Sequence, residues 1–345
     1  MTDIIDYTGE QESAWQEYVA RTPEATICHD IRWHPIIRQH LGHRPRYIMA
    51  VDGSEVQGLL PLFVVSTWWG VKYLISIPWL DYGGACADSV EVESKLVERA
   101  GEIARELGAQ FLELRSVEAH TSHLARRTDK VTFLLDLSIG ADDLFRKQFD
   151  AKLRNQIRKS EKSGLTSVVG GKELLADFYR VFSRNMRDLG TPVWSSGLFG
   201  AVLDVFGQSA RLIVANDADG HTIAGALALT FKDRMYVPSA SAYRSARRLC
   251  PNHAIYWRLI SDACEQSLRY FDFGRSTWDS GTFLFKKQWV PNPTQLTWQY
   301  DLNLIDSVPA VNPGNSKYNL LIGIWKRLPL PLANLLGPRV IRNFP

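Results

Sequence analysis

The sequence predicts an α+β protein built from two related halves. Strands and helices are mixed along the 345 residues, and in each half a long helix precedes a late strand, an order that suits an α+β fold better than a doubly wound sheet. A second observation is an internal repeat: FLELRS at 111–116 and FDFGRS at 271–276 share Phe, Arg and Ser, and each follows a helix of similar length. A hydrophobic content of 45% is ample for two packed cores.

Bulk properties exclude several protein classes. The formal net charge of +3 does not indicate a dedicated nucleic-acid binder, and its positive excess lies in 307–345, which holds five basic residues and no acidic one. Four cysteines without a repeated spacing suit reduced thiols in a cytoplasmic protein, and the acidic N-terminus does not resemble a secretion signal. The longest apolar stretch, 58–80, is interrupted by Pro61 and Lys72, so it indicates two buried strands rather than a membrane span.

The first half shows clear local signals. Trp15, Tyr18 and Val19 share one face of a predicted helix, Asp52-Gly53 is a strong hairpin turn, and Gly108 is a typical helix stop. The predicted elements are strands at 3–8, 46–51, 56–65, 72–77 and 110–115 and helices at 12–20, 33–41 and 90–107.

The second half is predicted to repeat this order. Its first helix, at 142–163, has a buried stripe of aromatic and aliphatic residues at every fourth position, Phe145, Phe149, Leu153 and Ile157. Its other faces are basic, which fits either a solvated surface or contact with phosphate or RNA. The remaining predicted elements are a helix at 172–189 and strands at 131–137, 211–215, 222–231, 234–239 and 294–302.

The stretch 236–289 is the most informative part of the chain. It begins as a strand, passes through a loop that carries Arg244, Arg247 and Arg248, enters a long helix and returns as a strand. Pro251 and Asn252 mark the helix start, with Asn252 as the expected N-cap. Backbone N–H groups at a helix start bind anions, so this loop is predicted to hold phosphate, although a basic loop with a helix cap explains it equally.

The same stretch resembles a known family. RRLCPNHAIYWRLISDACEQSLRYFDFGRS and FLFKKQW in the second half, together with PEATICHDIRWHPIIRQHLGHRPRYIMAV, IPWLDYGGACAD and AKLRNQIRKSEKSGL, resemble the Fem family of acyltransferases, from about residue 22 to 302. Members attach amino acids to peptidoglycan precursors, and related ones belong to exopolysaccharide or protein-sorting gene clusters. The resemblance implies two tandem GNAT-like domains, each a mixed, mostly antiparallel sheet flanked by helices. We expect them at 1–137 and 165–304, joined by a basic linking helix at 138–164 and followed by a basic, apolar tail at 305–345.

Common catalytic motifs are missing from the sequence. It contains no G-x-S-x-G elbow, Walker loop, G-x-G-x-x-G or paired Cys/His metal pattern, so hydrolase, nucleotide-binding and metalloenzyme functions lose ground. Moving an acyl group from an activated ester or thioester to an amine needs only a site that positions both reactants, stabilises an oxyanion and removes a proton. Lys, Arg and a carboxylate can supply such a site.

Two residues are predicted to be catalytic. Phe285 and Lys286 match the aromatic-Lys pair of the family, which implies that Lys286 stabilises charge on the acyl carbonyl or the leaving group. Lys287, the next residue, is an alternative candidate for this role. Lys286 could equally be a solvated helix lysine without a catalytic role. Asp81 matches an acidic residue of the family, which implies that it binds or deprotonates the acceptor amine, but a turn-forming Asp fits as well.

Further residues are predicted to bind substrate. The arginines and Asn252 would hold donor or acceptor phosphates, and aromatic side chains would flank a sugar or pantetheine arm, although aromatic residues are more often core. The complete predicted set is Arg247, Arg248, Asn252, Tyr243, Arg275, Trp278, Asp279, Phe285, Tyr82 and Arg154.

These inferences predict a cytoplasmic N-acyltransferase that forms an amide on a cell-envelope precursor of the exopolysaccharide or peptidoglycan type. The acceptor would be a nucleotide- or lipid-linked amino sugar or peptide. The donor would be acyl-CoA, an acyl-carrier protein or aminoacyl-tRNA, with no metal and no permanently bound cofactor. The alternative is a non-catalytic duplicated fold that binds a glycan or assembly partner. The basic, apolar tail fits either contact with the inner face of a membrane or packing on the second domain.

Overall fold

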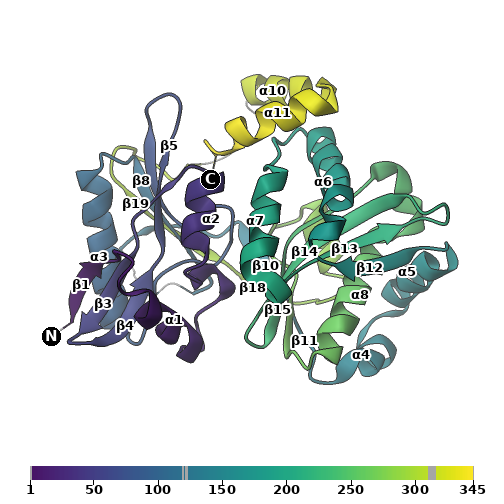
Figure 1. Ribbon diagram of the computed structural model, residues 1–345, viewed down its shortest axis with the longest axis horizontal. Coiled ribbons are helices and arrows are strands. Elements are labelled where there is room, and N and C mark those ends of the chain that lie inside the picture. The colour runs from purple at the N-terminus through teal and green to yellow at the C-terminus, as the bar shows by residue number, and fades with distance from the viewer. Residues whose placement is uncertain (1, 119, 121–122, 310–315, 345) are drawn as a thin grey trace. The chain divides into compact units, whose positions relative to one another are not determined.

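The computed structural model describes residues 2–118, 120, 123–309 and 316–344, and the chain divides into two compact units (Figure 1). The first unit comprises Met1–Val131, Gln295–Val311 and Arg342–Pro345, and the second comprises Thr132–Thr294 and Asn312–Ile341. Each unit contains a six-stranded sheet with one parallel pair and otherwise antiparallel neighbours. The predicted α+β class is therefore confirmed.

Two sheets form the first unit. One has the order β1-β3-β4-β7, and the other has the order β2-β5-β6-β8-β19-β9, in which β6 and β8 are parallel. The predicted hairpin is present, because β3 and β4 pair antiparallel around Gly53, whose φ of +61° suits glycine. The strands are β1 Asp3–Asp6, β2 Arg44–Pro45, β3 Ile48–Asp52, β4 Glu55–Leu60, β5 Leu62–Ser66, β6 Lys72–Ser76, β7 Cys86–Ala87, β8 Phe111–Ser116, β9 Ala125–Arg127 and β19 Thr297–Leu302.

Amphipathic helices cover the sheets of the first unit. Helix α1, Glu12–Arg21, buries Trp15, Tyr18 and Val19, as predicted. Helix α3 is capped by the Ser89 side chain and packs an apolar face into a core of β-strand residues. The other helical segments of this unit are η1 Ile27–His29 and α2 Trp33–His40, and α3 spans Val90–Glu106.

The second unit is built on a sheet of order β11-β16-β15-β14-β13-β12. Helices α6 and α8 both pack against its strands β13 to β15. The strands are β11 Leu134–Asp136, β12 Thr166–Gly170, β13 Ala210–Asn216, β14 Thr222–Phe231, β15 Arg234–Ala242 and β16 Tyr270–Asp272, and the short strands β10 Lys130–Thr132, β17 Ser276–Thr277 and β18 Thr294–Gln295 lie outside these sheets. The helical segments are α4 Gly140–Asp143, η2 Leu144–Gln148, α5 Ala151–Lys162, η3 Lys172–Leu174, α6 Leu175–Leu189, α7 Ser196–Phe206, η4 Gly207–Ser209, η5 Arg244–Leu249, α8 Pro251–Glu265, α9 Gly281–Lys286, α10 Ser316–Arg327 and α11 Leu330–Ile341.

The predicted single helix at 142–163 is wrong. The chain is interrupted at Phe149, which has an extended ψ of 138°, and α5 starts anew behind Asp150, whose carboxylate accepts a hydrogen bond from the Leu153 N–H at 2.7 Å. An Asp N-cap stabilises a new helix start and ends the preceding one. Phe149, Leu153 and Ile157 are buried as predicted, because both helical pieces face the same core.

Other differences concern elements without a strong local pattern. Strand β12 and helix α7 were not predicted; α7 contains two glycines, which weaken a helical signal. The last strand was predicted to end the second domain at 165–304, but β19 pairs with β8 and β9 of the first unit. Helix α5, predicted as a linker, packs on α8 within the second unit.

The C-terminal tail is folded as two helices of the second unit. Helices α10 and α11 pack on α6, where the Arg187 side chain donates a hydrogen bond to the Leu328 carbonyl at 2.9 Å. No helix among the described residues is long and apolar enough to cross a membrane.

Candidate functional site

The strands β15 and β16 diverge in the second unit. They pair in parallel only from Arg234–Tyr270 to Tyr236–Asp272, after which β15 continues to Ala242. A β-bulge lies at the same level, since the register between β14 and β15 shifts beyond Tyr236. Bulges are common beside active sites, because they re-aim the chain. Beyond Tyr236, β15 no longer pairs with β16, and its residues 238–240 are half-buried.

Gly274 makes this divergence possible. Its φ of +70° turns the chain away from β15, and a Cβ there would lie 2.8 Å from the Val237 carbonyl oxygen. The turn is tied by Asp272, a buried residue whose Oδ1 accepts hydrogen bonds from the Gly274 N–H at 2.9 Å and the Thr132 hydroxyl at 2.8 Å. The loop after β16 is therefore fixed by its own sequence.

Lys286 lies beneath this loop. Its side chain is only 7% exposed, and its Nζ donates hydrogen bonds to the carbonyl oxygens of Gly274 at 2.8 Å and Arg275 at 2.9 Å. A buried ammonium requires such partners, so the interpretation of Lys286 as a solvated lysine is wrong. Lys287 is exposed and lies over the Phe283 ring at 5.7 Å.

Phe285, predicted to contact substrate, lies in an aromatic cluster. Its ring lies 5.1 Å from His253 and 5.2 Å from Tyr256, and Trp289 is 6.2 Å away. Burial lowers the pKa of His253 to about 4, so this imidazole is neutral at physiological pH. The cluster holds α9 on α8 and so positions Lys286, the next residue in the chain.

Residues after β16 are more open. Arg275 is half-buried, Trp278 is exposed and packs on Phe283 at 5.0 Å, and Asp279 is exposed with a φ of +58°. Left-handed backbone at a residue other than Gly costs energy and occurs often at functional loops. These three residues share a loop with the carbonyl groups that Lys286 binds.

A basic segment follows β15 directly. Arg244, Arg247 and Arg248 are exposed on η5, and among the described residues none is hydrogen-bonded or ion-paired to their guanidinium groups. Helix α8 begins at Pro251, and its N-terminus has no side-chain cap. Pro251 has no N–H, and the N–H groups of His253 and Ala254 already bond to the Cys250 carbonyl at 3.0 and 3.3 Å. The exposed guanidinium groups are therefore the main anion-binding feature of this segment.

The predicted N-cap Asn252 is wrong. The N-cap is Cys250, in a left-handed conformation with φ of 60°, and Asn252 lies in the first turn of α8. The Cys250 thiol donates a hydrogen bond to Gln156 Oε1 at 2.7 Å, which joins α5 to the start of α8. Lys159 of α5 is close enough to this thiol to act on its pKa, and so it adds positive charge here.

Two other predicted residues also lie in the second unit. The Arg184 guanidinium lies over the Tyr243 ring, 5.0 Å from the ring centroid, in a cation–π contact. This contact places a further cation, from α6, at the end of β15. Arg154 donates a hydrogen bond to the Phe149 carbonyl at 2.5 Å, so this side chain closes the helix break. The structure thus brings Tyr243, Arg247 and Arg248 together on one segment and assigns Arg154 a local structural contact.

Asp81 and Tyr82 belong to the first unit. Both are buried in the loop between β6 and β7, and the Tyr82 carbonyl accepts a hydrogen bond from the Thr26 hydroxyl at 3.2 Å. The same loop has positive φ at Ile77 (44°) and Trp79 (77°). Positive φ is a genuine outlier for a β-branched residue and stores strain that often accompanies function.

A buried polar network supports this loop. Arg115 donates hydrogen bonds to the Leu80 carbonyl at 2.8 Å and to Glu113 at 2.7 Å, and its guanidinium lies 4.5 Å from the Trp298 ring. The Tyr300 hydroxyl donates to the other Glu113 oxygen at 2.7 Å. A buried ion pair needs all these partners to offset its desolvation.

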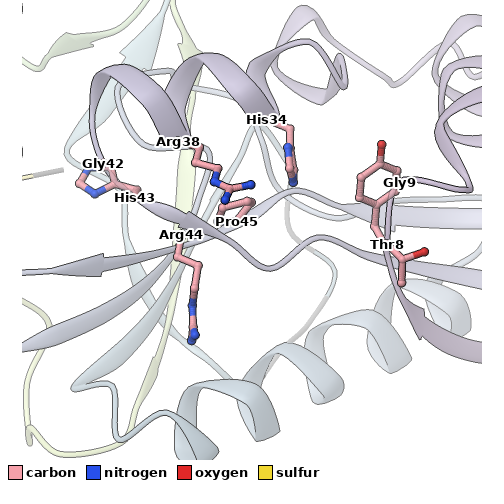
Figure 2. Close-up of a pocket in the computed structure, with 9 residues that line it drawn as sticks. Thr8, Gly9, His34, Arg38, Gly42, His43, Arg44 and Pro45 are labelled. Carbon is pink, nitrogen blue, oxygen red and sulfur yellow. The ribbon is translucent and has the colours of Figure 1, made fainter.

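A pocket in the first unit was not among the predicted sites. It has a volume of about 620 Å³ and is lined by Tyr7, Thr8, Gly9, His34, Arg38, Gly42, His43, Arg44 and Pro45. Figure 2 shows His34 and Arg38 extending from α2 above the segment that carries Arg44. The i, i+4 spacing of His34 and Arg38 is the signal that marks this face in the sequence.

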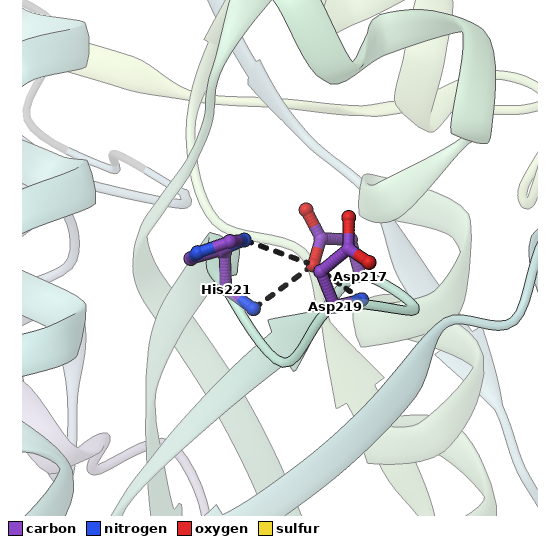
Figure 3. Close-up of side chains that lie close together, drawn as sticks. All are labelled: Asp217, Asp219 and His221. Carbon is purple, nitrogen blue, oxygen red and sulfur yellow. Dashed lines mark hydrogen bonds and ion pairs between the residues drawn. The ribbon is translucent and has the colours of Figure 1, made fainter.

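A cluster of Asp217, Asp219 and His221 lies at the turn between β13 and β14 (Figure 3). Asp217 Oδ1 accepts hydrogen bonds from the N–H groups of Asp219 at 3.1 Å and His221 at 2.9 Å. These bonds close the turn, which accounts for the cluster.

Comparison with known proteins agrees with the architecture. Residues 147–287 match the family model of an acetyltransferase (GNAT) domain. This segment contains the divergent strands, the basic segment and Lys286. This segment is thus similar in sequence to GNAT domains. A comparison with curated protein sequences finds no match.

Solved structures share the fold of the whole chain. FemX is 14% identical, with a TM-score of 0.63 over 88% of this chain and 98% of its own. L-PGS from Bacillus licheniformis is 14% identical, with a TM-score of 0.57 over 94% of this chain and 98% of its own. A tandem GNAT protein from the clavulanic acid biosynthesis pathway is 12% identical, with a TM-score of 0.52 over 89% and 100%. The predicted Fem-like, tandem GNAT architecture is therefore confirmed in fold.

Proposed function

We propose that the chain transfers an acyl group from an activated ester or thioester to an amino group of a cell-envelope precursor, with the donor held by the second unit. The observation that carries this proposal is the edge of β15 beyond Tyr236. It lies between the buried ammonium of Lys286 and the exposed arginines of η5. An extended donor arm can pair its amide groups with such a strand edge.

The chemistry requires little beyond placement. The acceptor nitrogen attacks the donor carbonyl, a C–N bond forms, and the C–S or C–O bond to the leaving group breaks. The proton that the nitrogen loses ends on the released thiol or hydroxyl. Negative charge develops on the carbonyl oxygen and then on the leaving group. A fixed ammonium such as Lys286 in a dry environment stabilises both, directly or through the loop whose carbonyl groups it orders.

Phosphate is the chemistry that the predicted donors share. Acyl-CoA, acyl-carrier protein and aminoacyl-tRNA all carry phosphate on the arm or strand that ends in the reactive ester or thioester. Arg247 and Arg248 are exposed beside the uncapped start of α8, so their charge is available to such groups. Asp81 as the group that binds the acceptor amine stays a prediction, and so does action at the inner face of the membrane on a lipid-linked acceptor.

A donor screen tests the proposed function. Purified protein is mixed with acyl-CoA, acyl-carrier protein or aminoacyl-tRNA and with amino-sugar or peptide acceptors, and amide products are detected by mass spectrometry. We expect one donor class to give product and Lys286→Met to lower kcat about 100-fold or more, whereas the exposed neighbour variant Lys287→Met stays within about twofold.

Two controls separate folding from chemistry. Circular dichroism and thermal unfolding establish that the Lys286→Met protein is folded, and titration with the donor measures its affinity. Full activity of folded Lys286→Met would remove the role of Lys286. The absence of amide with every donor class would overturn the proposed function as a whole.

A further inference from the structure

The two C-terminal helices expose an apolar face. On α10 the outward residues are Leu320, Leu321 and Ile324, each between 51% and 64% exposed. On α11 the exposed residues are Leu332, Leu335 and Leu336, whose i, i+3 and i+4 spacing places them on one side of the helix. Soluble surfaces rarely expose several large aliphatic side chains together, so this face is expected to meet an apolar partner.

The opposite sides of both helices are already used. On α10, Ile322 lies so close to Gly190 that a Cβ on this glycine would be 2.5 Å from it. On α11, Gly337 packs against Val193, and the Asn334 amide lies 3.5 Å from the Ser183 hydroxyl. The inner faces therefore anchor the helices on the second unit. The outer leucines are not part of that packing.

The charge of this segment selects the partner. Residues 316–344 contain no Asp or Glu, and the exposed basic residues Lys326, Arg327 and Arg339 lie in the last turns of α10 and α11. The stem of Lys326 follows the inner side of α10, where its Cε would lie 3.1 Å from a Cβ on Gly190, and its ammonium group is at the helix end. Basic charge at the ends of apolar helix faces fits a surface of anionic lipids, because the leucines enter the acyl boundary while the cations meet the headgroups. A helix of 12 residues lies in this boundary and does not span it.

We propose that the outer face of α10 and α11 binds the surface of an anionic lipid bilayer. The helices lie flat, with Leu321, Ile324, Leu332 and Leu335 in contact with the acyl region. This interaction is independent of the acyl donor and acceptor, since it uses neither Lys286 nor the basic segment of η5. It would keep the enzyme next to lipid-linked acceptors.

The turn between β5 and β6 in the first unit also exposes large apolar side chains. These are Trp68 (63% exposed) and Trp69 (54% exposed). The Trp68 N–H donates to the Asn343 side chain at 3.0 Å, and Trp69 lies 5.9 Å from the exposed ring of Phe344. Tryptophan prefers the interface between headgroups and acyl chains, so the composition of this turn by itself suits contact with lipid.

Vesicle sedimentation without substrates tests the proposal. Intact protein is mixed with two kinds of vesicle. One consists of phosphatidylcholine alone, and in the other about one lipid in three is the anionic phosphatidylglycerol. We expect the anionic vesicles to bind at least about tenfold more protein. The triple variant Leu321→Ser, Leu332→Ser, Leu335→Ser and the charge variant Lys326→Glu, Arg327→Glu should each lose most of this binding, and Trp68→Ser, Trp69→Ser should weaken it.

The matched control is Val168→Ser, Val205→Ser, which removes two exposed apolar residues from other surfaces of the second unit. It should bind vesicles like the intact protein. Equal binding by the triple leucine variant and the control would overturn the proposal. A lack of binding by intact protein would also overturn the proposal. A third contrary result is a dimer, detected by light scattering, that the leucine variant abolishes, because the face would then be a contact between copies of the chain.

Discussion

The parallel strand pairs of the two units end differently. In the first unit, β6 and β8 stay joined after their parallel register, because the Ser76 hydroxyl accepts a hydrogen bond from the Arg115 N–H at 2.8 Å. The Arg115 side chain, Glu113 and Tyr300 then fill the space with a buried network. In the second unit, β15 separates from β16 beyond Tyr236 and keeps an open edge.

A buried cation orders the loop beside each pair. Arg115 binds the Leu80 carbonyl in the first unit, and Lys286 binds the Gly274 and Arg275 carbonyls in the second. The surroundings differ: the first cation is neutralised by Glu113, whereas exposed arginines follow the strand in the second unit. The same topology thus gives a filled junction in one unit and an open, positively charged one in the other. This contrast favours the second unit as the donor site.

The largest expected effect concerns the filled junction. Arg115→Met leaves Glu113 buried without its partner, so we expect the free energy of unfolding to fall by about 3–5 kcal/mol in chemical denaturation. The control is Arg105→Met, which removes an exposed ion pair with Asp301 and should cost at most about 1 kcal/mol. If the folded Arg115→Met protein instead lost donor affinity at unchanged stability, the first unit would hold the donor.

Sequence patterns predicted most of the fold because the decisive signals are local. Trp15, Tyr18 and Val19 share a helix face, and Asp52-Gly53 forms its turn. The pairing of β19 with β8 joins residues far apart in the chain, which no local pattern encodes. Asp150 is a typical N-cap residue and so indicates the helix break at Phe149. The apolar residues at every fourth position around it instead predict one continuous helix.

The candidate site was predicted less completely. Family resemblance pointed to Lys286, but only the structure shows that its ammonium is buried on backbone carbonyls. Asn252 is the expected cap of α8, but the left-handed Cys250 takes that position, and the helix has no side-chain cap. The divergence of β15 and β16 depends on Gly274, whose φ is not evident from composition.

A smaller effect is expected from one buried histidine in each unit. Burial, with Arg342 nearby, lowers the pKa of His43 to about 4, and burial lowers the pKa of His253 to about 4 against the opposing effect of a hydrogen bond to the Gln288 side chain. In the unfolded chain these imidazoles bind a proton near pH 6.5, whereas in the folded chain they stay neutral until about pH 4. The free energy of unfolding is therefore highest above about pH 6.5 and decreases as the pH falls toward 4.

Each histidine should account for about 2–3 kcal/mol of the loss between these limits. His43→Gln and His253→Gln should each make unfolding less sensitive to pH over this range, and hydrogen exchange in β6 and β14 reports the first and second unit separately. An unchanged pH dependence in either variant would show that the corresponding imidazole does not remain neutral in the folded protein.

The smallest expected effect concerns the basic segment. Arg247→Ala and Arg248→Ala should each raise the KM for the donor about three- to tenfold at low salt and leave kcat nearly unchanged, because exposed charges contribute modestly and are screened. The control is Arg180→Ala, an exposed residue paired with Asp177 on α6. An equal rise in KM for the control would indicate a general effect of net charge.

Hydrogen–deuterium exchange with bound donor tests the contrast between the units most directly. We expect at least one of acyl-CoA, acyl-carrier protein and aminoacyl-tRNA to slow exchange in 237–254, along the unpaired edge of β15 and the start of α8. The loop 77–84 of the first unit should stay unchanged. Protection confined to 77–84, with none in 237–254 for any donor, would contradict it.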